Sequence, residues 1–175
     1  MPTLVWSDTA LATGRAHRCS PAQFRSYPPS PWSWLTVDPD GGPGAGVACS
    51  IGHYEPLCDR LLGTRSAPQD RRPGAPSLLT VLTRAVPGQD AAYHDWYSGT
   101  HLPEVLTLAG YVAAQRFSAS AESSVPRPFL ALYELDARDA QPVLDTLDAA
   151  TRTWMRRSDA IDGPAILAWL FDPVD

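Results

Sequence analysis

The sequence predicts an α+β fold for residues 77–175, and three observations support this prediction. Apolar and β-branched residues form four short runs bounded by turn residues. Two longer stretches repeat apolar residues at spacings of three and four, which is typical of amphipathic helices. The elements follow the order strand, helix, strand, strand, helix, strand, which is the ferredoxin-like βαββαβ arrangement. We therefore expect a four-stranded antiparallel sheet with both helices on one face.

The four strands are recognised by their composition and by the turns that flank them. Pro87-Gly88 ends the first run, and Gly110 precedes the second. Apolar residues occupy both faces of the strands, so the face without helices needs a cover, either a second copy of the sheet or the N-terminal region. The strands are expected at Leu78–Val86, Tyr111–Ala119, Phe129–Leu135 and Ala165–Phe171.

The two helices are expected at 89–108 and Asp139–Arg157. In the second, Asp139 is a candidate for the cap and Pro142 lies in the first turn, where a missing N–H costs nothing. In the first, Pro103 lies inside the helical pattern and would clash with the preceding turn. The first helix is therefore expected to kink or restart beside His101.

Residues 1–76 differ in composition from the rest of the chain. They contain eleven of the eighteen prolines and eight of the twelve glycines, which interrupt any long element. Two interpretations stay open for 1–76: an irregular N-terminal region, or a degenerate first repeat that supplies half of a barrel. Residues 77–175 form the second domain. Short elements are expected in the first part, as strands at Thr3–Trp6, Trp32–Val37 and Val47–Ile51 and a helix at Pro56–Leu62.

Composition excludes several classes of function. The net charge of −5 and the pI near 5.2 argue against binding to nucleic acid or to an anionic membrane surface. The sequence shows neither a long apolar run nor a secretory signal, so we expect a cytoplasmic protein. All fourteen basic side chains are Arg. A chain without Lys forms no Schiff base and has no P-loop lysine.

The cysteines and the known motifs add mostly negative information. Cys19, Cys49 and Cys58 are an odd set with no secretory signal, so free thiols are expected. With His17 and His53 they form a weaker zinc hypothesis, because their spacing lacks paired close ligands. Dinucleotide, P-loop, nucleophile-elbow and zinc-protease motifs do not occur. No cofactor is expected, although a single axial His leaves heme as an alternative.

Residues 93–104 are the most informative part of the chain, because they combine two histidines, two carboxylates and three large aromatic residues. A surface helix rarely needs this combination on one stripe, so the stretch predicts a helix that lines a small-molecule pocket. The structural alternative is that His101 bonds a backbone carbonyl freed at the Pro103 break. The stripe repeats at spacings of three and four, at Tyr93, Trp96, Tyr97, Thr100, His101 and Glu104.

These motifs resemble the EthD-like members of the dimeric α+β barrel superfamily over residues 77–173. The residues that carry the resemblance are Trp96-Tyr97, His101-Leu102-Pro103-Glu104, Gly110-Tyr111, Arg116-Phe117 and the Leu130–Leu135 strand. The resemblance implies a barrel of two packed sheets, closed between two subunits or within one chain, so a homodimer is expected. It also implies a pocket between the sheet and its helices.

The resembled superfamily includes aromatic polyketide cyclases and quinone-forming monooxygenases. The resemblance therefore implies a cofactor-independent enzyme of secondary metabolism that acts on an aromatic or polyketide-like small molecule. Cyclisation, dehydration or isomerisation would use His101 as the acid or base, since an imidazole exchanges protons near neutral pH. The alternatives are a cofactor-free monooxygenase of a phenol and a non-catalytic binding or assembly protein. The remaining candidates are Glu104 and His53 for catalysis, and Trp96, Tyr97, Tyr93, His94, Tyr133 and Arg116 for substrate binding.

Overall fold

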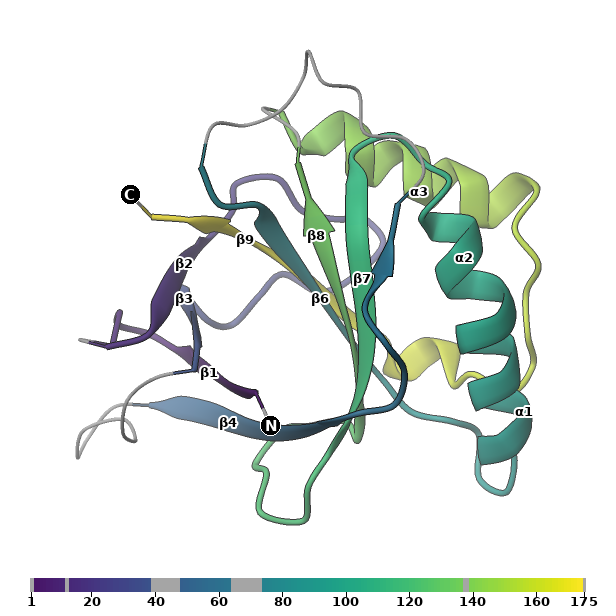
Figure 1. Ribbon diagram of the computed structural model, residues 1–175, viewed down its shortest axis with the longest axis horizontal. Helices are drawn as coiled ribbons and strands as arrows, with labels where there is room; N and C mark the ends of the chain where they lie inside the picture. The colour runs from purple at the N-terminus through teal and green to yellow at the C-terminus, as the bar shows by residue number, and fades with distance from the viewer. Residues whose placement is uncertain (1, 12, 39–47, 64–73, 137–138, 175) are drawn as a thin grey trace.

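The computed structural model describes residues 2–11, 13–38, 48–63, 74–136 and 139–174. Their strands form one antiparallel sheet that closes on itself (Figure 1). Around the barrel the order is β4-β1-β3-β2-β9-β6-β8-β7, and pairing of β4 with β7 closes the ring. The strands are β1 (Thr3–Ser7), β2 (Arg15–Cys19), β3 (Trp34–Val37), β4 (Cys49–Pro56), β5 (Leu61–Leu62), β6 (Ser77–Thr83), β7 (Tyr111–Ala119), β8 (Phe129–Leu135) and β9 (Leu167–Pro173).

Helices cover one side of this barrel, outside the sheet formed by β6 to β9 (Figure 1). Three short pieces follow one another between β6 and β7, and a longer helix joins β8 to β9. The pieces are α1 (Asp90–Trp96), the π-helical turn η2 (Tyr97–His101) and α2 (Leu102–Val105), followed later by α3 (Gln141–Thr153) and the 3₁₀ turn η3 (Gly163–Ala165).

The fold class predicted from the sequence is wrong. One chain forms a closed eight-stranded antiparallel β-barrel, mostly sheet with short helices, in place of an α+β ferredoxin-like half that pairs in a dimeric barrel. The closing pairs join distant residues: Cys19 on β2 pairs with Phe171 on β9, and Tyr54 on β4 pairs with Ala119 on β7. Periodicity along the chain reports the faces of a strand but not such distant partners, which is why the prediction failed.

The interior of the barrel holds one of two apolar clusters. It contains Trp6, Tyr54, Phe117, Trp169 and Phe171, all at most 4% exposed. The second cluster lies between the outer face of β6 to β9 and the helices. The expectation that these strands are apolar on both faces is therefore confirmed. Strands β1 to β4 supply the cover for the inner face, since a sheet rolled into a barrel encloses its own core.

Individual elements were predicted unevenly. β7 and β8 have the predicted bounds, and β1 and β3 lie within one or two residues of theirs. The helix expected at Pro56–Leu62 is wrong, because that segment ends β4 and forms β5. β4 overlaps the strand expected at Val47–Ile51, although Val47 lies outside the described residues. Strand β2 was missed, since its sequence Arg-Ala-His-Arg-Cys has no alternation of apolar residues and its one buried position is the polar His17.

Candidate functional site

A π-helical turn places His101. The backbone N–H of Leu102 donates to the carbonyl of Tyr97, five residues earlier, where an α-helix would use the fourth. Pro103, next in the chain, has no N–H to donate, and its ring disfavours a regular α-helical turn before it. The kink predicted at this position takes the form of this wider turn, a feature often found at functional sites.

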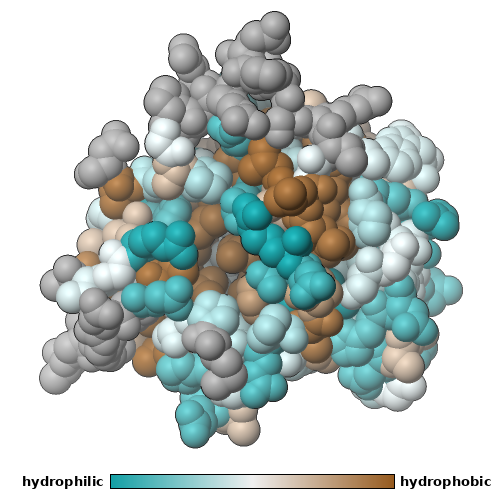
Figure 2. Space-filling model, viewed as in Figure 1, coloured by the Kyte–Doolittle hydropathy of each residue, from teal (hydrophilic) through white to brown (hydrophobic). Residues whose placement is uncertain are grey.

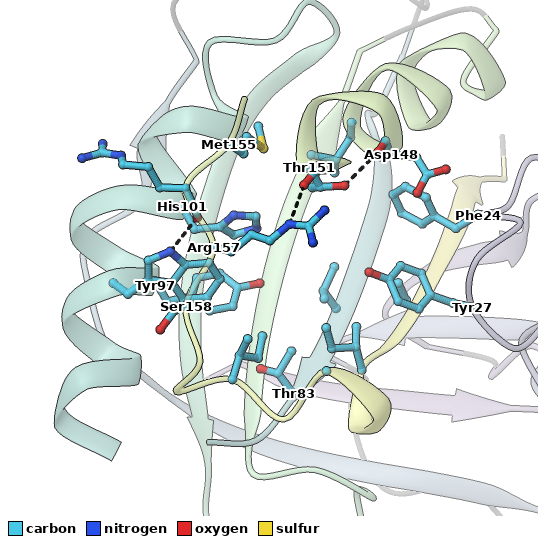
Figure 3. Close-up of a pocket in the computed structure, with 18 of the residues that line it drawn as sticks. Phe24, Tyr27, Thr83, Tyr97, His101, Asp148, Thr151, Met155, Arg157 and Ser158 are labelled. Atoms are coloured by element: carbon cyan, nitrogen blue, oxygen red, sulfur yellow. Dashed lines mark hydrogen bonds between the residues drawn. The ribbon is translucent and has the colours of Figure 1, made fainter. Parts of the chain in front are cut away.

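A cavity of about 380 Å³ lies between this helical segment, α3 and the outer face of the sheet (Figure 3). This volume is in the range that holds a small organic molecule. Its lining is mainly apolar and aromatic, with a few polar groups. The lining residues are Phe24, Tyr27, Val81, Thr83, Trp96, Tyr97, His101, Tyr133, Leu147, Asp148, Thr151, Met155, Arg156, Arg157, Ser158, Ile161, Gly163, Ile166 and Ala168.

The His101 ring is held between two aromatic residues at the cavity wall. It stacks on Trp96 with 4.9 Å between ring centroids and meets the edge of Tyr97 at 5.0 Å. Burial lowers the pKa of His101 from 6.5 to about 4, against the opposing effect of Glu104. At neutral pH the imidazole is therefore uncharged, with one nitrogen able to accept a proton.

Glu104 lies beside His101 in sequence but pairs elsewhere. Its Oε1 accepts from Nε of Arg156 at 2.8 Å, and its Oε2 accepts from the Arg156 backbone N–H at 3.1 Å. The Trp96 indole N–H also donates to the Arg156 carbonyl, at 2.8 Å. Glu104 thus fastens the segment after α3 to the helix that carries His101. It is not among the residues that line the cavity.

Two tyrosines among the lining residues contact each other through their hydroxyl groups. Tyr97 and Tyr133 both line the cavity, and their hydroxyl oxygens lie 3.4 Å apart. Burial raises the pKa of both phenols well above the usual range, so both stay protonated. The Tyr133 hydroxyl donates to that of Tyr97, and the Tyr97 proton remains able to bond another acceptor. Tyr93 lies behind them, with its hydroxyl 2.6 Å from Oγ1 of Thr83, which lines the cavity.

Arg116 and His94 form a second layer beneath these tyrosines. The Arg116 guanidinium is 1% exposed and lies over the rings of Tyr93 and Tyr97, at 5.0 and 4.5 Å. It donates to Oγ of Ser98 at 2.7 Å and lies 3.1 Å from Nδ1 of His94. Neither Arg116 nor His94 lines the cavity, so the structure places them behind the wall rather than at its surface.

His53 does not join this group. It lies on β4, where its Nδ1 is 3.1 Å from Oγ1 of Thr3 on β1, and it is not among the residues that line the cavity. The cysteines and histidines proposed for zinc also stay apart: no group of three His, Cys, Asp or Glu side chains suited to a metal ion is found in the described part of the chain.

Sequence reasoning missed several residues that line the cavity. Phe24 and Tyr27 come from the Pro-rich segment before β3, Asp148 and Thr151 from α3, and Arg157 from the turn after it. Only the charged run Arg156-Arg157 at the end of the predicted helix could have indicated a site. The aromatic pair from the N-terminal segment carries no local signal, because its place depends on how the barrel closes.

Comparisons with protein-family models, with curated proteins and with solved structures found no match. The resemblance to EthD-like proteins therefore stays a prediction. None of the helices in the described residues is both long and apolar enough to cross a membrane.

Proposed function

We propose that this chain is a cofactor-independent enzyme that acts on a planar aromatic or polyketide-like molecule in the cavity beside His101. The observation that carries the proposal is an uncharged imidazole, stacked on Trp96, at the wall of an aromatic cavity. Aromatic walls favour a flat ligand, because offset and edge contacts between rings add to the burial of area.

The chemistry most consistent with these groups is removal of a proton next to a carbonyl group. Cyclisation, isomerisation and dehydration of a polyketide-like chain can all begin with this step. His101 would accept the proton. The Tyr97 hydroxyl, which accepts from the Tyr133 hydroxyl at 3.4 Å, would donate to the carbonyl oxygen as it becomes an enolate oxyanion. The enolate would also stabilise the new imidazolium, raising the pKa of His101 from its value in the empty cavity.

A proton-exchange assay tests this proposal without the natural substrate. In deuterated water, the protein is expected to accelerate exchange of the α-protons of 1-tetralone, an aromatic ketone, as followed by NMR. His101→Gln is expected to reduce the acceleration by about a hundredfold or more. Tyr97→Phe removes one oxyanion donor and is expected to cost about tenfold or more. The proposal requires exchange to survive His53→Gln, since His53 lies outside the cavity lining.

The lowered pKa of His101 also favours a second candidate, a protein that binds such a molecule without changing it. A neutral imidazole whose conjugate acid has a pKa of about 4 is a weak base. Binding of aromatic ligands with no proton exchange for any aromatic ketone would support this second function. Exchange that is unaffected by His101→Gln would remove His101 from the mechanism.

We also propose a cytoplasmic location. The three cysteines are free, and free thiols persist most readily in a reducing compartment. Fractionation of the producing cells with an antibody against the protein tests this location.

A further inference from the structure

Among the described residues, one of the guanidinium groups around the cavity has no carboxylate partner. Three charged residues line the cavity: Asp148, Arg156 and Arg157. Asp148 is paired with Arg152, and Arg156 with Glu104. Arg157 forms no ion pair with any carboxylate of the described residues; its Nε donates to the carbonyl of Thr151 at 3.2 Å. The cavity therefore carries a net positive charge from Arg157.

The backbone next to Arg157 is held in place, and the Arg157 side chain itself is exposed. The backbone of Arg156 is fixed by the Trp96 indole, which donates to its carbonyl, and by Glu104, which accepts from its N–H. From this anchored segment the Arg157 side chain runs toward Thr151 on α3, across the space between His101 and Phe24 (Figure 3). Because Nε forms the hydrogen bond to Thr151, the two outer guanidinium nitrogens remain able to donate to a ligand. Their planar arrangement matches the two oxygens of a carboxylate.

Arg116 provides a second and independent positive charge on the other side of the wall. It is 1% exposed, and its hydrogen-bond partners are neutral: the Ser98 hydroxyl, the His94 carbonyl and the His94 ring. No ion pair to Arg116 is found among the described residues. Tyr97 lies between this cation and the cavity. A buried charge without a counter-ion acts over a longer range than an exposed one, because water screens it less.

We propose that the cavity selects anions, and that its ligand is a planar aromatic carboxylate whose carboxylate group is bound by Arg157. The aromatic rings would pack against the aromatic residues of the lining, with the carboxylate directed to the Arg157 side chain that crosses the space between His101 and Phe24. This inference rests on the proposed function, since it names the class of molecule that the same cavity binds. Arg157 acts here as a specificity-determining residue, and the ligand is an aromatic ketone or phenol that also bears a carboxylate.

Two matched probes test the inference by calorimetry: 2-naphthoate and its neutral amide, 2-naphthamide. The natural protein is expected to bind the acid at least about tenfold more tightly than the amide. Arg157→Gln is expected to abolish this preference by weakening the binding of the acid and leaving that of the amide unchanged. Arg157→Lys is expected to retain part of the preference. Arg18→Gln, which removes the same charge from an exposed position on β2, is the control and is expected to leave the preference intact.

The outcomes separate the inference from the proposed function. Equal binding of acid and amide, or an unchanged preference in Arg157→Gln, would overturn the selection of anions while leaving an aromatic cavity. If Arg157→Gln loses binding of both the acid and the amide, Arg157 has a structural role in positioning the end of α3, and the inference is also overturned. If the natural protein binds neither probe, both the proposed function and the selection of anions are overturned. Thermal melts of each variant show whether the fold is retained.

Discussion

The rings of Trp96 and His101 lie nearly parallel, with centroids 4.9 Å apart and 24° between their planes. These residues are five positions apart. On a regular α-helix such residues point about 140° away from each other, so they could not stack. The π-helical turn at Tyr97–His101 widens the helix and brings residues five apart toward the same side. The irregular turn thus creates the contact that buries the imidazole.

The first prediction concerns the titration of His101. Its imidazole is expected to titrate at about pH 4, because burial disfavours the charged form. Trp96→Ala removes the stacked ring and admits water, so the pKa is expected to rise toward the ordinary value of 6.5. NMR titration of the imidazole resonances measures both values. Trp154→Ala, at a tryptophan that is 52% exposed beyond α3, is the control. A His101 pKa near 6.5 in the natural protein would contradict the buried position of this ring.

The second prediction concerns stability against pH. The folded-state pKa of His101 is lowered from 6.5 to about 4, so below pH 6.5 the unfolded chain binds a proton that the folded chain excludes. Stability is therefore lost as pH falls from 6.5 toward 4. By linkage, protonation of His101 in the unfolded chain lowers the free energy of unfolding by about 2 kcal/mol between about pH 7.5 and pH 5. His101→Gln is expected to reduce the loss by this amount in urea unfolding at the two pH values. Equal losses in both proteins would refute the prediction.

The third prediction compares two buried tyrosines in the outer core. Tyr111 has a buried hydroxyl with no hydrogen-bond partner among the described residues, whereas the Tyr93 hydroxyl bonds Oγ1 of Thr83. Tyr111→Phe is expected to leave stability unchanged or to raise it. Tyr93→Phe is expected to cost about 1–3 kcal/mol, because the buried Thr83 hydroxyl loses its partner. Urea unfolding of the two variants gives the comparison, and a reversed order would contradict it.

The fourth prediction concerns a glycine inside the barrel. The Tyr54 ring folds back over Gly52 on the same strand, and a Cβ at Gly52 would lie 2.6 Å from the ring carbon Cζ. Tyr54 is fully buried, so the ring has little room to move. Gly52→Ala is expected to cost about 1–3 kcal/mol through overpacking.

A double-mutant cycle isolates this contact. In a Tyr54→Leu background the added methyl group of Gly52→Ala meets a smaller side chain, so its cost is expected to fall by about 1 kcal/mol or more. If Gly52→Ala costs the same in both backgrounds, the contact with the Tyr54 ring is not what requires glycine here.

Local sequence patterns predicted several of the elements and the chemistry of the stripe. β7 and β8 were predicted with their observed bounds, because alternating faces and flanking turns report local conformation. Pro103 predicted the break beside His101, since a residue without an N–H disturbs the helix before it. The aromatic stripe predicted a pocket, and Trp96, Tyr97 and His101 line one.

The closure of the barrel and the set of residues that face the cavity depend on long-range packing. Cys19 and Tyr54 find their partners on β9 and β7, more than half the chain away in one case, and no local pattern encodes such pairing. The same long-range packing brings Phe24 to the cavity and leaves His53 outside it. Residue type sets what a side chain can do, but the neighbours that bury it, pair it or leave its charge uncompensated come from distant parts of the chain.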